Sequence, residues 1–208
     1  MIKVHHLNNS RSQRILWLLE ELGADYEIVH HTRNAETRLA PESLKAVHPL
    51  GKSPVIEDGD MAIAESGAIT DYLIRAYGGG TLMPATGTAE HERYNEWLHF
   101  AEGSAMLPFL LALYTRMLGD AAAPLAPRIQ SEIANHLSYM SKCLGEQDYF
   151  MGHALTGADI MNSFVLEAAN ASGALSHYPN LRAHVERFQA RDAYKAALEK
   201  GGPYQLGG

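Results

Sequence analysis

The sequence predicts a small α/β domain followed by an all-helical domain. Short β-rich runs alternate with helical patterns only within residues 1–77, and helical patterns alone continue from residue 89 onward. A stretch rich in Gly, Thr and Pro, GGGTLMPATGT, separates these two regions. We therefore expect an α/β domain at residues 1–79, a linker at 80–88 and a helical domain at 89–208.

The first thirty residues have the pattern of a β-α-β unit. IKVHHL at residues 2–7 and YEIVHH at residues 26–31 are typical of strands, whereas RSQRILWLLEELG between them has apolar residues at helical spacing. Gly23 provides a C-terminal stop for that helix. This order predicts a right-handed crossover and a parallel strand pair.

The rest of the α/β domain has the pattern α-β-β-α. Asp58-Gly59 is a strong hairpin signal between two short apolar runs, PVIE and MAIA. A short helix is expected before this hairpin, at PESLKAV, where Pro41 suits a first helical position. A longer helix is expected after it, from Ser66 to the glycines that begin at Gly78.

Composition limits the class of protein. The chain has 208 residues, 46% of them hydrophobic, and a formal net charge of -7, which argues against a nucleic-acid-binding protein. One cysteine allows no intrachain disulfide, so a reducing compartment is expected. No signal-peptide pattern and no apolar run of transmembrane length is present, so we expect a cytoplasmic protein without a membrane partner.

Two short motifs offer groups for binding an amino-acid-like ligand. Ser66 begins a helix, whose first N–H groups form an anion site, and the neighbouring Glu65 can accept from an ammonium group. Pro54, in KSPV, opens an apolar strand and cannot donate a ladder hydrogen bond. These residues alone leave plain alternatives open: Ser66 as an ordinary N-cap, Glu65 as a solvated acid and Pro54 as a trans edge-strand proline.

Several strings resemble the cytosolic glutathione transferases. HPLGKSPVIEDGDMAIAESGAITDYL is similar to the glutathione-binding core of that family, through G-x-x-P at Gly51–Pro54 and the Glu65-Ser66 pair before a helix. SRSQRILWLLEELGADYE resembles the first helix of bacterial and fungal members, and LTGADIMNSFVLEAA resembles the family's T-x-x-D segment. WLHFAEGSAMLP resembles the start of the C-terminal domain in one bacterial and fungal subgroup.

This resemblance spans nearly the whole chain and implies a fold and a set of binding residues. The fold is a thioredoxin-like α/β N-terminal domain plus an all-α helical-bundle C-terminal domain. By the same resemblance Pro54 follows a cis peptide bond, Ser53 binds the cysteinyl backbone of glutathione, and Glu65 with Ser66 holds the γ-glutamyl group. Lys52 is expected near the glycyl carboxylate.

The family places a thiol-activating Tyr, Ser or Cys after the first strand. Residues 7–12, LNNSRS, contain no Tyr or Cys, so Ser10 is expected to donate to the thiolate, as in serine-type members. Ser10-Arg11-Ser12-Gln13 also fits an S-x-x-Q capping box, which would direct the Ser10 hydroxyl at the helix backbone instead. Asn9, Ser12 or backbone amides are the remaining candidates.

Two other groups of residues have structural interpretations. Thr156 and Asp159 fit an N-cap with an acid at N3, with Leu155 and Ile160 as a hydrophobic staple, so loss of Asp159 should lower stability by roughly 1 kcal/mol or more. The pairs His5-His6 and His30-His31 lie in strands, where neighbours point to opposite faces, and no metal site is expected.

The expected activity is attack of the glutathione thiolate on a small hydrophobic electrophile, bound against the helical domain. Glutathione is the expected co-substrate. Glutathione-dependent peroxide or disulfide reduction is an alternative within the same site, and a non-catalytic ligand-binding protein is an alternative of another class. The family resemblance also implies a homodimer.

Overall fold

A mixed β-sheet forms the centre of the N-terminal region. The computed structural model describes residues 1–37 and 39–206. The strands are β1 (Ile2–Leu7), β2 (Tyr26–His31), β3 (Val55–Asp58) and β4 (Met61–Ala64). They lie in the order β2-β1-β3-β4, with β1 parallel to β2 and antiparallel to β3. The predicted parallel pair and hairpin are therefore confirmed.

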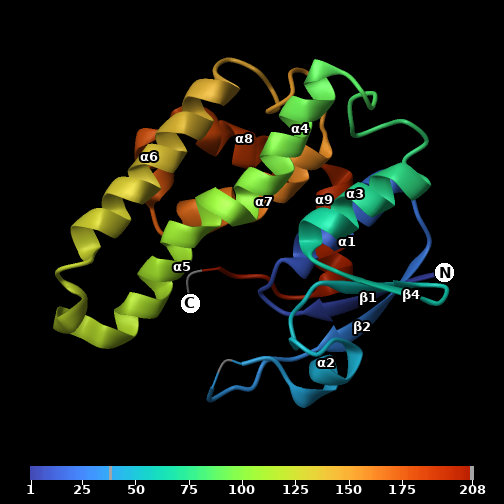
Figure 1. The fold of residues 1–208 in the computed structure, drawn as a ribbon, viewed down its shortest axis with the longest axis horizontal. Coiled ribbons are helices and arrows are strands. Elements are labelled where there is room, and N and C mark those ends of the chain that lie inside the picture. The colour runs from blue at the N-terminus through green and yellow to red at the C-terminus, as the bar shows by residue number, and fades with distance from the viewer. Residues whose placement is uncertain (38, 207–208) are drawn as a thin grey trace. The chain divides into compact units, whose positions relative to one another are not determined.

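Helices cover both faces of this sheet. Figure 1 shows α1 (Ser12–Leu22) and α3 (Ser66–Tyr77) above the sheet and α2 (Glu42–Val47) below it. α1 ends at Gly23, whose φ of 60° lies in the left-handed region that glycine adopts without a Cβ clash. These elements follow the predicted order and form the thioredoxin-like part of the fold.

The described chain divides into two compact units that do not coincide with the two halves of the sequence. Unit 1 contains the described residues up to Met83 together with residues 188–206, and unit 2 contains residues 84–187. The expected division assigned all of residues 89–208 to the helical domain. In the structure, the last helix, α9 (Asp192–Gly201), belongs with the sheet instead.

Aromatic packing explains why α9 joins unit 1. Trp17 of α1 is fully buried, and its ring stacks on Phe188 with 5.3 Å between centroids and meets the edge of Tyr194 at 5.5 Å. Beside these rings, the Arg191 guanidinium binds both carboxylate oxygens of Glu21, at 2.5 and 2.8 Å. Residues near the C-terminus thus complete the core that begins at residue 2.

Unit 2 is helical throughout its regular structure. Its α-helices are α4 (Ala89–Phe100), α5 (Met106–Thr115), α6 (Ala126–Leu144), α7 (Gly157–Ala171) and α8 (Pro179–Gln189), whose last two residues fall in unit 1. Short 3₁₀ helices occupy Arg116–Ala122 and Ala174–His177. Within the described residues, we find no helix whose length and apolar character would let it span a membrane.

The helical run from α4 to α5 changes register without a break before Pro108. The proline lies inside α5, and the change of helical register comes one turn earlier, in a π-helix at Ala101–Ala105. There the Met106 N–H donates to the Ala101 carbonyl, five residues back. A proline ring clashes with the carbonyl four residues before it, and the wider π turn lies at that position.

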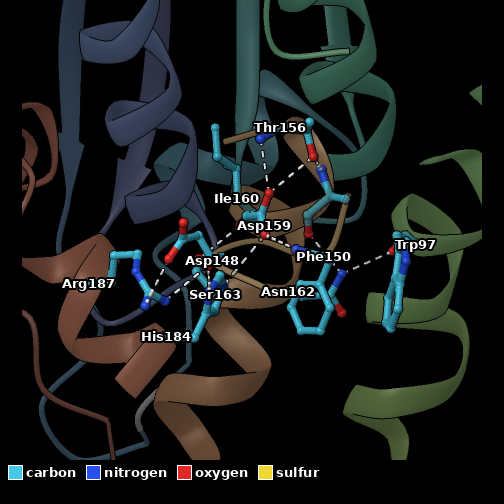
Figure 2. A network of polar contacts seen from close by, with 11 residues as sticks. Trp97, Asp148, Phe150, Thr156, Asp159, Ile160, Asn162, Ser163, His184 and Arg187 are labelled. Atoms are coloured by element: carbon cyan, nitrogen blue, oxygen red, sulfur yellow. Dashed lines mark hydrogen bonds and ion pairs between the residues drawn. The ribbon is translucent and has the colours of Figure 1, made fainter. Parts of the chain in front are cut away.

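The capping box predicted at Thr156 is confirmed, and it belongs to a larger buried network at the start of α7 (Figure 2). Asp159 is fully buried, and one of its carboxylate oxygens accepts from the Thr156 N–H at 2.9 Å and the Thr156 hydroxyl at 3.1 Å. The other accepts from the Phe150 N–H at 2.8 Å. Asp159 therefore fixes the loop before the helix as well as the helix end.

A second polar contact in Figure 2 joins α7 to α4. The Asn162 amide donates to the Trp97 carbonyl at 3.2 Å and to the Ala158 carbonyl at 2.8 Å. The Trp97 carbonyl also accepts from the N–H of Ala101, the first residue of the π-helix. Asn162 thus supports the backbone at the point where the long helix changes register.

Candidate active site

Ser10 lies in the loop that connects β1 to α1. The preceding residue, Asn9, has a φ of 51°, a left-handed conformation that asparagine tolerates better than most side chains. This conformation turns the chain from the strand into the helix. Arg33, which follows the C-terminal end of β2, donates to the carbonyl oxygens of Asn8, at 3.1 Å, and Asn9, at 3.4 Å, and so fixes the loop.

The Ser10 hydroxyl is buried among other hydroxyl groups. It accepts from the Ser12 N–H at 3.2 Å, lies 2.8 Å from the Ser12 hydroxyl and directs its own proton toward the Ser53 hydroxyl at 3.5 Å. The full S-x-x-Q capping box does not form, because the Gln13 N–H donates to the Ser10 carbonyl rather than to its hydroxyl. The hydroxyl does accept from the backbone of the helix, at the Ser12 N–H.

Ser53 contacts Ser10 from the segment that leads into β3. The Ser53–Pro54 peptide bond is cis, as the resemblance implied. The Ser53 hydroxyl donates to the His5 carbonyl at 2.8 Å. Its single proton is therefore in use, and toward Ser10 it presents only an acceptor oxygen.

Glu65 and Ser66 stand at the N-terminus of α3, which begins at Ser66 as predicted. Glu65 is the N-cap residue, exposed, with a φ of 68°, whereas Ser66 is the first helical residue and is buried. The interpretation of Ser66 as an ordinary N-cap is therefore wrong. Glu65 presents a solvent-facing carboxylate beside the unpaired N–H groups of the first turn.

Arg14 contacts the candidate site, and sequence reasoning missed it. It is 2% exposed, on the buried side of α1, and its guanidinium donates to the Ser66 hydroxyl. Burial of a guanidinium is rare without a partner, and here it adds positive charge at the N-terminus of α3, where the helix dipole has the same sign. An arginine inside an otherwise apolar helix face was the available signal.

Lys52 precedes Ser53 in the chain and is exposed to solvent. The structure thus brings Ser10 and Ser53 into contact and places Glu65 next to Ser66. Lys52 is connected to these residues only as the neighbour of Ser53 in the chain. The chemistry available here is donation to an anion by hydroxyl and helix N–H groups, together with an exposed carboxylate that can accept from a cation.

His6 is a second residue that sequence reasoning did not assign. Its Nδ1 lies 2.9 Å from the Ser12 hydroxyl, and the ring also hydrogen-bonds the Gly201 carbonyl of α9. Burial, together with the neighbouring His30 and His31, lowers the pKa of His6 from 6.5 to about 4, so the ring is neutral at physiological pH. His6 packs edge-on against His30 at 5.8 Å.

We expect His6 to make the protein sensitive to acid. Between pH 6.5 and about 4, His6 is protonated in the unfolded chain but neutral in the folded protein. The free energy of unfolding therefore falls as pH decreases. From about pH 7 to about pH 5 the loss should reach about 2 kcal/mol, with His31, whose pKa burial also lowers, acting in the same direction. Urea unfolding at these two pH values measures it.

His6→Gln should flatten this pH dependence, and His153→Gln should leave it as steep as in the parent, because the His153 side chain is 90% exposed. Equal slopes for His6→Gln and the parent protein would contradict the assignment.

The histidine pairs face opposite sides of the sheet, as predicted. His5 contacts His31 and Glu57, each at 3.1 Å, while His6 contacts His30. Over the described part of the chain, no group of three or more His, Cys, Asp or Glu side chains has an arrangement suited to a metal ion.

Comparison with known proteins agrees with this geometry. Residues 1–75 match the family model described as glutathione S-transferase, N-terminal domain, and residues 107–201 match the glutathione S-transferase C-terminal domain. Glutathione S-transferase 3 of Schizosaccharomyces pombe is 34% identical over 96% of this chain and 88% of its own length.

Solved structures are also similar over nearly the full chain. A glutathione S-transferase from Actinobacillus pleuropneumoniae is 38% identical, with a TM-score of 0.89, over 97% of this chain and 93% of its own. A glutathione transferase family member from Pseudomonas fluorescens, solved with two glutathione molecules bound, is 26% identical, with a TM-score of 0.81, over 95% of this chain and 92% of its own. The protein belongs to the glutathione S-transferase family.

Proposed function

We propose that this protein is a serine-type glutathione transferase in which the Ser10 hydroxyl donates a hydrogen bond to the glutathione thiolate. The observation that carries the proposal is the direction of the hydrogen bonds around Ser10. The Ser12 N–H occupies an acceptor site of the Ser10 oxygen, and Ser53 uses its own proton on the His5 carbonyl. The Ser10 proton is thus a donor whose long 3.5 Å contact to Ser53 is easily exchanged for a stronger acceptor.

A thiolate is such an acceptor. The free thiol has a pKa of about 8.5, and lowering it by about two units requires roughly 2.7 kcal/mol of preferential stabilisation of the anion. A charge-assisted hydrogen bond from Ser10 and the N-terminal end of α1, which begins at Ser12, can supply energy of this order. The thiolate then attacks a small hydrophobic electrophile, and the leaving group departs with the electron pair of the broken bond.

The proposed binding residues match the chemistry of the tripeptide. Ser53 would pair with the cysteinyl backbone and Lys52 with the glycyl carboxylate. Glu65 would accept from the γ-glutamyl ammonium group, while Ser66 and the first N–H groups of α3 would bind its carboxylate. The buried Arg14 guanidinium on Ser66 supports this last role, because it reinforces the positive end of the helix.

The test is Ser10→Ala, compared with Ser131→Ala on the exposed face of α6. Ser10→Ala should slow conjugation of an aryl halide at least about tenfold and raise the apparent pKa of the bound thiol, because a charge-assisted hydrogen bond is lost. The measurements are the pH profile of kcat/KM and the ultraviolet absorbance of bound thiolate. If Ser10→Ala is as active as Ser131→Ala, the donor to the thiolate is Asn9, Ser12 or a backbone amide instead of Ser10.

The alternative functions predict different results when the protein is tested with aryl halides, hydroperoxides, disulfides and immobilised glutathione. Turnover of hydroperoxides or disulfides without turnover of aryl halides would identify a reductase. Retention on immobilised glutathione with no turnover of either would identify a binding protein. We further propose a cytoplasmic homodimer, with the glutathione site in residues 1–79, on the strength of the family resemblance and the single cysteine.

A further inference from the structure

The C-terminal end of unit 1 contacts the loop that carries Ser10. After α9, residues 202–206 run on as an irregular tail. The backbone N–H of Gln205 donates to Asn9 Oδ1 at 2.7 Å, between residues 196 positions apart in the sequence. Asn9 is the residue immediately before Ser10.

Asn9 is a position where such a contact affects conformation. Its φ of 51° is sparsely populated for a residue with a side chain, so the surrounding contacts must hold it. The Arg33 guanidinium donates to the Asn9 carbonyl, and the Gln205 N–H donates to the Asn9 side-chain oxygen. Release of the second contact would let the backbone relax toward its more populated conformations, and the Ser10 hydroxyl would move with it.

The same C-terminal segment reaches Ser10 from its other neighbour. Gly201 of α9 packs against the His6 ring, since a Cβ on Gly201 would lie 3.4 Å from His6 Cε1. His6 Nδ1 lies 2.9 Å from the Ser12 hydroxyl, and that hydroxyl lies 2.8 Å from the Ser10 hydroxyl. These contacts connect α9 to Ser10.

Close packing keeps Gly201 at this position. A Cβ there would lie 2.8 Å from Gln13 Oε1, 2.9 Å from Leu16 Cδ1 and 3.4 Å from His6 Cε1, so α9 approaches α1 more closely than a side chain permits. Gly201 therefore stays packed against His6.

We propose that the segment Gly201–Leu206 is a positioning element for Ser10, in which the Gln205 N–H binds Asn9 and Gly201 packs against His6, the residue that contacts Ser12. The inference rests on the proposed role of Ser10 and extends it to the C-terminus of the chain. The segment itself contacts neither the thiol nor the electrophile. It orients the Ser10 hydroxyl, which contacts the thiol.

The test compares Gln205→Pro with Gln205→Ala. Both variants lack the same side chain, and only proline lacks the N–H that Asn9 accepts. Gln205 lies in the tail beyond α9, so proline breaks no helix there. Relative to Gln205→Ala, Gln205→Pro should raise the pKa of the bound thiol, lower kcat about fivefold and speed amide hydrogen exchange at residues 8–12, with both variants melting at nearly the same temperature.

Asn9→Gly completes the comparison, because glycine keeps the left-handed backbone accessible while removing the Oδ1 acceptor. In the Asn9→Gly background, proline and alanine at position 205 should give the same thiol pKa, since the contact is already lost. Equal thiol pKa and equal exchange for Gln205→Pro and Gln205→Ala in the parent background would overturn the proposal.

The exchange measurement separates this proposal from the proposed function. Faster exchange at residues 8–12 in Gln205→Pro, together with an unchanged thiol pKa in Ser10→Ala, would mean that the segment positions the loop but that Ser10 is not the donor. Unchanged exchange together with a raised thiol pKa in Ser10→Ala would reject the positioning role and leave Ser10 as the donor.

Discussion

Asp159→Ala should destabilise unit 2 by about 4 kcal/mol, more than the loss of a helix cap alone. The cap accounts for the bonds from Thr156, but the carboxylate also accepts from the Phe150 N–H at 2.8 Å. Asp159 is 0% exposed, so water cannot replace the lost acceptor, and each buried donor left unpaired costs about 1–3 kcal/mol.

Denaturant unfolding followed by circular dichroism measures this effect, with Asp120→Ala as the control because Asp120 is an exposed acid of the same unit. Glutathione binding by the folded fraction should persist, since Asp159 lies in unit 2 and the proposed binding residues lie in unit 1. A midpoint equal to that of Asp120→Ala would contradict the structural role.

Trp17→Ala should destabilise unit 1 by about 4 kcal/mol, because truncating a fully buried tryptophan combines lost burial with a large cavity. The Trp17 ring contacts Phe188 and Tyr194, and its indole N–H donates to Glu21 at 2.8 Å. Glu21 in turn binds Arg191, so the substitution weakens the attachment of α9 by both apolar and polar contacts.

The sequence has two tryptophans, so in Trp17→Ala the fluorescence of Trp97 reports on unit 2 alone. Circular dichroism should show the loss of stability, and the control is Met117→Ala, a large apolar residue that is 90% exposed. Loss of stability in Trp17→Ala no greater than in Met117→Ala would disprove the importance of this contact.

The local elements of the fold could be predicted from sequence because periodicity and turn residues are local signals. The strand runs at residues 2–7 and 26–31, and the stop at Gly23, coincide with β1, β2 and the end of α1. The membership of α9 in unit 1 could not be predicted in this way. Helical spacing identifies an apolar face, but nothing in residues 192–201 shows that the face packs on Trp17.

The candidate site was predictable to the extent that its residues are close in sequence. Glu65 and Ser66 share one helix terminus, and Ser53 and Pro54 share one strand start, so their motifs are visible in single strings. Ser10 fitted two local patterns, and the hydrogen bonds exclude the full capping box, because the Gln13 N–H donates to the Ser10 carbonyl. Contacts such as Gln205 with Asn9 depend on the completed fold and leave no local pattern.

The aromatic contact between Trp17 and residues of α8 and α9 has a consequence for biosynthesis. A ribosome makes the sheet before the residues that cover Trp17, so part of the core of the nascent thioredoxin-like unit stays exposed while the intervening helices are translated. A fragment that stops before residue 188 would keep that apolar surface open, and such a truncated chain should be a substrate for chaperones and proteases rather than a working half-enzyme.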